Sequence, residues 1–132
     1  MSHTPQPRGF ALLVEDEPFV AMVAGQILAD EGFEVVEAAS AAAALSHLEG
    51  RPGGYALAVV DLGLPDMRGD ALVLELRGRA SDLPIIVASG YGLGELRDIF
   101  TTVSRVALVT KPYDTAALRR ALETLGFAVG TD

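Results

Sequence analysis

The chain has 132 residues, of which 50% are hydrophobic and 21% are charged, a balance typical of one globular domain. Its formal net charge of -8 argues against direct binding to nucleic acid, since phosphate contacts need clustered Lys and Arg. The absence of cysteine excludes disulfide scaffolds, thiolate zinc sites and thiol nucleophiles, and no apolar run approaches the roughly 20 residues of a membrane span. With no segment resembling a signal peptide, we expect a cytoplasmic protein that does not bind membranes.

Apolar runs alternate with helical patterns along most of the chain. Residues 1–8 carry two prolines and no periodicity, so we expect a loose tail, then one domain over residues 9–127 and a short tail at 128–132. In chain order we expect strands at 10–14, 34–38, 57–60, 84–88 and 106–109, and helices at 18–31, 41–49, 71–77, 95–100 and from about 115 to 125.

Several helix starts have recognisable signals. Pro18 is placed where a proline is favoured at the first helical position, and Ser40 is a good N-cap for an Ala-rich helix. We expect Asp70 to cap the third helix, and Asp114 or Thr115 to cap the last one. Phe19 follows Pro18 at helical spacing with other apolar residues, which indicates a packing role.

Five apolar strands alternating with helices predict an α/β fold, with a parallel sheet covered by helices on both faces. The strands are continuous hydrophobic runs, as burial on both faces requires. Right-handed crossovers leave few topologies, and five strands favour a doubly wound, flavodoxin-like (βα)5 sheet in the order 2-1-3-4-5.

Chemically active side chains follow four of these strands at their carboxyl ends, where open α/β sheets bind ligands. They are Glu15 and Asp16 after the first strand, Asp61 after the third, Ser89 after the fourth and Lys111 after the fifth. In the predicted order these four strands are neighbours, so we expect the side chains to share one crevice.

The residue types at this edge indicate phosphoryl chemistry. Three carboxylates repel one another and raise each other's pKa unless a cation lies among them. Oxygen ligands with a hydrated position suit Mg²⁺. An ammonium and a hydroxyl across the same crevice suit a transferring phosphoryl group, whose oxygens carry spread negative charge. We therefore interpret Asp61 as a nucleophile that forms an aspartyl phosphate, with Mg²⁺ and Lys111 neutralising the charge.

From about Gly9 to Leu125 the chain resembles the receiver domain of bacterial two-component response regulators. Four stretches carry the resemblance, in order and each at the end of an expected strand: Leu13-Val14-Glu15-Asp16-Glu17-Pro18, Val59-Val60-Asp61-Leu62-Gly63-Leu64-Pro65-Asp66, Ala88-Ser89-Gly90 and Thr110-Lys111-Pro112. Singly, the acidic pair and the Lys-Pro are weak signals; together the four are highly specific.

The resemblance implies a phosphoprotein in a phosphorelay, whose phosphoacceptor Asp61 takes phosphate from a histidine kinase or a histidine phosphotransfer protein. It implies that Mg²⁺ is bound by Asp16 directly, by Glu15 through a water, by Asp61 and by the backbone carbonyl of Gly63. It also implies that Lys111 contacts a phosphate oxygen and that the Ser89 hydroxyl moves towards the phosphate as a switch.

Two features depart from the family pattern. The aromatic switch residue usual three positions before the lysine is replaced by Leu108. Val87-Ala88-Ser89-Gly90-Tyr91 resembles a subgroup, often single-domain, with a Phe-Ala-Thr-Gly motif followed by a tyrosine. We therefore expect Tyr91 to replace the missing aromatic and to gate the loop before the fourth helix.

Three other functions fit these residues less well. A phosphatase of the haloacid-dehalogenase type needs a second acid two residues after the nucleophile, where this chain has Gly63. A flavodoxin-like FMN protein needs a phosphate loop after the first strand, where Glu15 and Asp16 would repel phosphate. An unphosphorylated docking module would not need the complete acidic triad and lysine.

We expect a signalling domain and not a metabolic enzyme, one that catalyses only its own phosphorylation and dephosphorylation. It would be a stand-alone monomer or weak dimer, or a receiver cut from a hybrid histidine kinase or longer regulator. Output would pass through the face of the fourth helix, fifth strand and fifth helix, or by phosphate transfer to a phosphotransfer protein.

Overall fold

The computed structural model describes residues 8–90, 104–111 and 114–128. Its elements are, in chain order, β1 (Phe10–Val14), α1 (Pro18–Asp30), β2 (Glu34–Ala38), α2 (Ala41–Gly50), β3 (Tyr55–Asp61), α3 (Gly69–Arg79), β4 (Ile85–Ser89), β5 (Val106–Thr110) and α5 (Thr115–Thr124). The helix expected at 95–100 lies outside the described residues, as does Tyr91.

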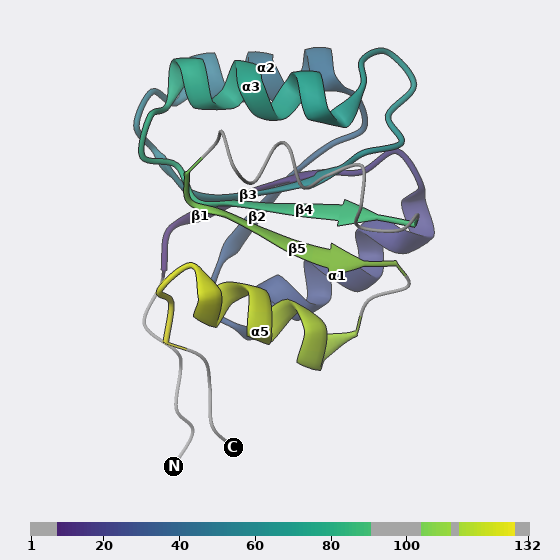
Figure 1. Ribbon diagram of the computed structural model, residues 1–132, viewed down its shortest axis with the longest axis vertical. Coiled ribbons are helices and arrows are strands. Elements are labelled where there is room, and N and C mark those ends of the chain that lie inside the picture. Colours follow the sequence, from purple (N-terminus) through teal and green to yellow (C-terminus); the bar gives the residue numbers. More distant parts are fainter. Residues whose placement is uncertain (1–7, 91–103, 112–113, 129–132) are drawn as a thin grey trace.

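The five strands form one parallel sheet in the order β2-β1-β3-β4-β5. This confirms the predicted flavodoxin-like order. Figure 1 shows α2 and α3 covering one face of the sheet, while α1 and α5 cover the other. The carboxyl ends of all five strands therefore lie at one edge, here called the carboxyl edge, and the opposite ends form the amino edge.

Burial on both faces follows from the alternation of side chains along each strand. Leu12 and Val60 pack into the cluster beneath α2 and α3, whereas Leu13 and Val59 pack into the cluster beneath α1 and α5. All four are at most 1% exposed. This packing makes the sheet a rigid platform for the side chains at its carboxyl edge.

Two of the expected helix caps are present. The Ser40 hydroxyl accepts a hydrogen bond of 3.1 Å from the Ala43 N–H, and the Asp114 carboxylate accepts one of 2.9 Å from the Ala117 N–H. Asp114, and not Thr115, is the cap of α5. Helix α1 begins with Pro18, as predicted.

The expected cap at Asp70 is wrong. Helix α3 begins at Gly69, its N-cap is Arg68, and Asp70 lies inside the first turn. The helix starts early because Gly69 has no side chain: its N–H donates to the Leu62 carbonyl at 3.2 Å, and a Cβ there would overlap the Leu62 Cα. Asp70 is still placed where an acid favours the positive end of the helix.

Two further expectations are corrected. Strands β3, β4 and β5 each extend one residue beyond their predicted carboxyl ends, because pairing between strands continues past the apolar runs; Asp61, for example, pairs with Ala88. Phe19 is not a packing residue, since it is 72% exposed on the first turn of α1. Among the described residues, no helix is both long and apolar enough to cross a membrane.

Candidate functional site

The expected site residues lie at the carboxyl edge because backbone pairing continues just past the strands. The Glu15 N–H donates to the Ala38 carbonyl at 3.0 Å, and the Lys111 N–H donates to the Ser89 carbonyl at 2.7 Å. Asp61 ends β3 and is only 6% exposed. The backbone that carries these side chains is therefore part of the sheet, even where the residues follow a strand.

Three acids converge at this edge. One carboxylate oxygen each from Glu15, Asp16 and Asp61 lies within 4.8 Å of the other two. Glu15 and Asp61 are buried, while Asp16 is exposed. The predicted convergence of these side chains is therefore present, with one exposed carboxylate at the rim and two beneath it.

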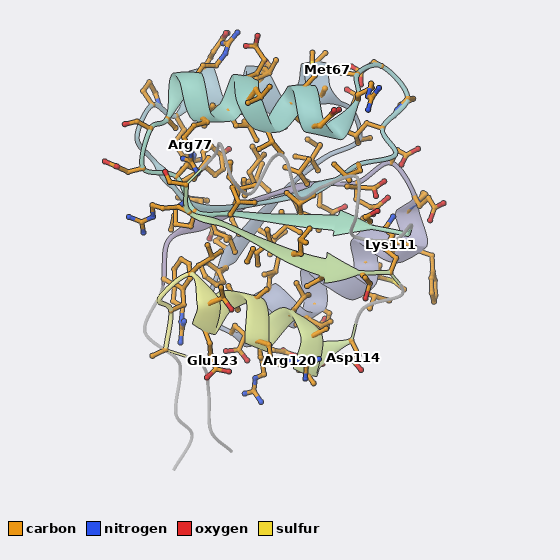
Figure 2. The ribbon with its side chains drawn as sticks, viewed as in Figure 1. Met67, Arg77, Lys111, Asp114, Arg120 and Glu123 are labelled. Atoms are coloured by element: carbon orange, nitrogen blue, oxygen red, sulfur yellow. The ribbon has the colours of Figure 1, made fainter. Side chains whose placement is uncertain are left out.

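Lys111 lies between the two buried acids. Its Nζ is 2.9 Å from Glu15 Oε1 and 2.9 Å from Asp61 Oδ1. Figure 2 shows Lys111 at the end of the sheet towards which the strand arrows point. One ammonium against three carboxylates leaves the cluster with an excess of negative charge, which a second cation would offset.

Burial has opposite consequences for the two kinds of charge. It raises the pKa of Glu15, and the contacts with Lys111 and the Glu17 N–H offset that effect only in part. Burial alone would lower the pKa of Lys111, but the ion pairs with Asp61 and Glu15 outweigh it and raise that pKa. Lys111 therefore stays charged, while the ionised form of Glu15 depends on its cationic neighbours.

The donor set fits a hard divalent cation. Glu15 Oε1 is buried and, within the described part of the chain, no donor is aligned with it in hydrogen-bond geometry, although Lys111 Nζ is close. Carboxylate oxygens with one exposed member are the ligands that Mg²⁺ accepts while keeping waters. Gly63 lies beside them, since a Cβ built on it would be 3.5 Å from Asp61 Oδ2. The cluster can therefore hold a metal ion.

Ser89 is the last residue of β4, is 3% exposed and pairs with Thr110 of β5. Its neighbour Ala88 pairs with Asp61. Leu108, at the position of the missing aromatic, is half-buried on the side of α2 and α3. The catalytic, switch and ligand roles of these residues stay predictions.

One residue of the central motif has a role that sequence reasoning did not assign. Asp66 Oδ1 accepts a hydrogen bond of 2.9 Å from the Ala41 N–H, and Asp66 Oδ2 accepts one of 3.0 Å from the Ala42 N–H. These bonds lower the pKa of Asp66. No local signal could have found this contact, because it joins residues 24 and 25 positions apart.

Comparison with known proteins agrees with this geometry. The model of the response regulator receiver domain matches residues 11–123. The sensor kinase CckA of Brucella abortus is 32% identical over 86% of this chain and 12% of its own length. The photosynthetic apparatus regulatory protein RegA of Cereibacter sphaeroides is 33% identical over 90% of this chain and 63% of its own.

A solved structure of the receiver domain from the hybrid histidine kinase CckA has a TM-score of 0.74 and 31% identity, covering 89% of this chain and 98% of that one. Both curated relatives are longer than the matched region, so the chain spans less than two thirds of their lengths.

Proposed function

The chain belongs to the response regulator receiver family, and from that premise we propose that Asp61 accepts a phosphoryl group from a phosphohistidine on a histidine kinase or phosphotransfer protein. The observation that carries the proposal is the position of Asp61, buried among acids and 2.9 Å from the Lys111 ammonium. A carboxylate in that position is restrained, ionisable and next to a cation that can take a phosphoryl oxygen.

In the proposed reaction an oxygen of Asp61 attacks the phosphorus, the P–N bond to the donor histidine breaks, and the bonding pair leaves with the imidazole. The Lys111 ammonium neutralises one phosphoryl oxygen, and the Ser89 hydroxyl donates to another. Bound by Glu15, Asp16, Asp61 and the Gly63 carbonyl, Mg²⁺ would supply further neutralisation of the phosphoryl charge.

The same residues argue against a metabolic phosphatase. Rapid hydrolysis of an aspartyl phosphate needs a general base near the acceptor, and the position two residues after Asp61 is Gly63. We therefore propose a signalling phosphoacceptor that catalyses its own phosphorylation and slow dephosphorylation, and nothing more. It would be part of a transferase only if the chain belongs to a hybrid kinase.

For output we propose the surface formed by the fourth helix, β5 and α5. Of this surface the structure describes β5 and α5, between which lies an open hollow of about 340 Å³, lined by Val106–Thr110 and by Ala117, Arg120, Ala121 and Thr124.

The curated relatives include a sensor kinase and a regulatory protein. They support two settings equally: a stand-alone receiver, or one domain of a hybrid kinase or longer regulator.

The proposed partners also set the proposed location. A histidine kinase takes the phosphoryl group of its phosphohistidine from ATP, so we place the chain in the cytoplasm. We propose that it is a monomer or weak dimer. Direct contact with nucleic acid or membrane is not part of the proposal, because the net charge of -8 opposes both phosphate backbones and anionic lipids.

The test is phosphorylation by a small donor. Wild-type protein incubated with Mg²⁺ and acetyl phosphate should gain the mass of one phosphoryl group, and the gain should be lost with EDTA and in Asp61→Asn. Asp70→Asn is the matched control, since it makes the same change at a carboxylate in the first turn of α3. A phosphoryl gain that persists in Asp61→Asn, or no gain in the wild type, would overturn the proposal.

A further inference from the structure

The loop between β3 and α3 carries Gly63 and is fixed at its middle by Asp66. The Asp66 carboxylate spans the first two N–H groups of α2, with one oxygen for each. Asp66 is itself exposed, so burial does not account for the contact. Its chemistry does: a carboxylate accepts two bonds from a positive helix end, which Ser40 alone cannot satisfy.

Helix α2 is a suitable anchor because it is already tied to the metal-ligand side of the sheet. Its Ala43 N–H is capped by Ser40, two residues after Ala38. The Ala38 carbonyl in turn accepts the Glu15 N–H at 3.0 Å. The strand end that carries Glu15 and the loop that carries Gly63 therefore meet at the same helix end.

The base of the loop is held as well. Gly69 packs directly against Leu62, and its N–H donates to the Leu62 carbonyl. Between these two residues, Leu64 and Met67 pack against the cluster beneath α2 and α3, and the Asp66 carboxylate adds two hydrogen bonds to the backbone of α2. Without these bonds, the middle of the loop would be held mainly by apolar packing, which is less directional than a hydrogen bond.

We propose that Asp66 is a positioning residue for the divalent cation: by clasping the amino end of α2, it holds the loop so that the Gly63 backbone faces Glu15, Asp16 and Asp61. That the cation is Mg²⁺ rests on the proposed function, whereas the effect of Asp66 on the binding of a cation can be measured without it. Groups that orient metal ligands without touching the metal contribute about 10- to 100-fold to affinity.

The experiment is a titration of the whole chain with Mg²⁺, followed by the amide NMR shifts of residues at the carboxyl edge. Asp66→Ala should weaken Mg²⁺ binding about tenfold. Asp66→Asn keeps one acceptor oxygen and should restore part of the affinity. Ser40→Ala is the matched control: it removes the other cap of the same helix and leaves the loop alone, so it should lower stability without changing Mg²⁺ affinity.

The outcomes separate the two proposals. Wild-type affinity in Asp66→Ala, or equal weakening in Ser40→Ala, would show that Asp66 only stabilises α2 and would overturn the positioning role. If Asp66→Ala fails to fold, the comparison of Asp66→Asn with Ser40→Ala decides in the same way. A wild type that takes up phosphate while Asp66→Ala keeps full Mg²⁺ affinity defeats the positioning role alone. Weakened Mg²⁺ binding in a chain that acetyl phosphate never modifies defeats the proposed function alone.

Discussion

The two ends of the same sheet use charge in opposite ways. At the carboxyl edge, Lys111 is outnumbered by the carboxylates of Glu15, Asp16 and Asp61. At the amino edge, Arg77 and Arg51 contact neutral groups. Figure 2 shows Arg77 and Lys111 at opposite ends of the strands.

The contacts at the amino edge are made between groups of the fold itself. Arg77 donates to the carbonyls of Ala80 at 2.9 Å, Ser81 at 3.1 Å and Ser104 at 2.6 Å, which joins the end of α3 to the turn before β5. The Arg51 guanidinium lies 3.6 Å from the centroid of the Phe10 ring. Carbonyl dipoles and a ring face stabilise these cations, although Arg77 Nε is buried and has no hydrogen-bond partner among the described residues.

The difference indicates that the amino edge contributes mainly to stability, whereas the carboxyl edge contributes to binding and reaction. The arginines at the amino edge are bound by groups of the fold itself, whereas the carboxyl edge has an excess of negative charge that another cation can offset. Such imbalance is typical of functional sites, where local stability is given up for binding. Removing a cation should therefore have different consequences at the two edges.

The largest expected effect is that of Lys111→Met, which removes the ammonium and keeps most of the apolar stem. Phosphorylation by acetyl phosphate should slow by about 100-fold or more, because one charge-neutralising contact is lost in the transition state. Without metal, the variant should be less stable by about 3 kcal/mol, since two buried carboxylates lose their partner. Urea unfolding with and without Mg²⁺ measures the second effect.

Mg²⁺ is the control for that interpretation. In the wild type, Lys111 already contacts Glu15 and Asp61, so an added cation has less charge left to offset. Mg²⁺ should therefore stabilise Lys111→Met more than it stabilises the wild type. Equal stabilisation of both proteins would mean that the ammonium and the metal do not share the same carboxylates.

The next effect belongs to the amino edge. Arg77→Ala should lower the free energy of unfolding by about 3 kcal/mol, because several backbone carbonyls lose a charged donor. It should leave the rate of phosphorylation unchanged. The control is Arg79→Ala on the same helix, whose guanidinium pairs with Glu49 and Glu75 at the surface, so its loss should change the free energy of unfolding far less. A slower phosphorylation in Arg77→Ala would mean that the two edges are coupled.

Much of the fold and site could be predicted because the signals are local or follow from general topology. Pro18 and Ser40 mark helix starts through the chemistry of their own side chains, and the strand order follows from crossover handedness. Parallel strands then bring Glu15, Asp61 and Lys111 to one edge without any knowledge of their contacts.

What failed depends on contacts between distant segments. Asp70 looks like a cap, but the close packing of Gly69 on Leu62 starts α3 two residues earlier than expected. Asp66 finds its partners 24 and 25 positions away along the chain, and Arg77 contacts Ser104 at 27 positions, so no periodicity or spacing reports these contacts. Phe19 has the spacing of a core residue and lies exposed, because the pattern gives the helix and not the neighbours that would cover its first turn.

The smallest expected effect is the pH dependence of the contact between the Asp66 carboxylate and the amino end of α2, at the carboxyl edge. Hydrogen bonds from the Ala41 and Ala42 N–H groups lower the pKa of this carboxyl in the folded chain. Its contribution to stability is therefore fully present above the unfolded pKa of about 3.9, and is lost as the pH falls through the lower, folded value. The free energy of unfolding of the wild type in urea should exceed that of Asp66→Asn at neutral pH. This difference should vanish in acid, because a protonated Asp66 resembles asparagine.

Ser40→Ala supplies the reference. Because a hydroxyl cap does not titrate, the difference in stability between the wild type and Ser40→Ala should stay constant with pH. If the Asp66→Asn gap were equally flat, the contact with α2 would depend on the shape of the side chain and not on its charge.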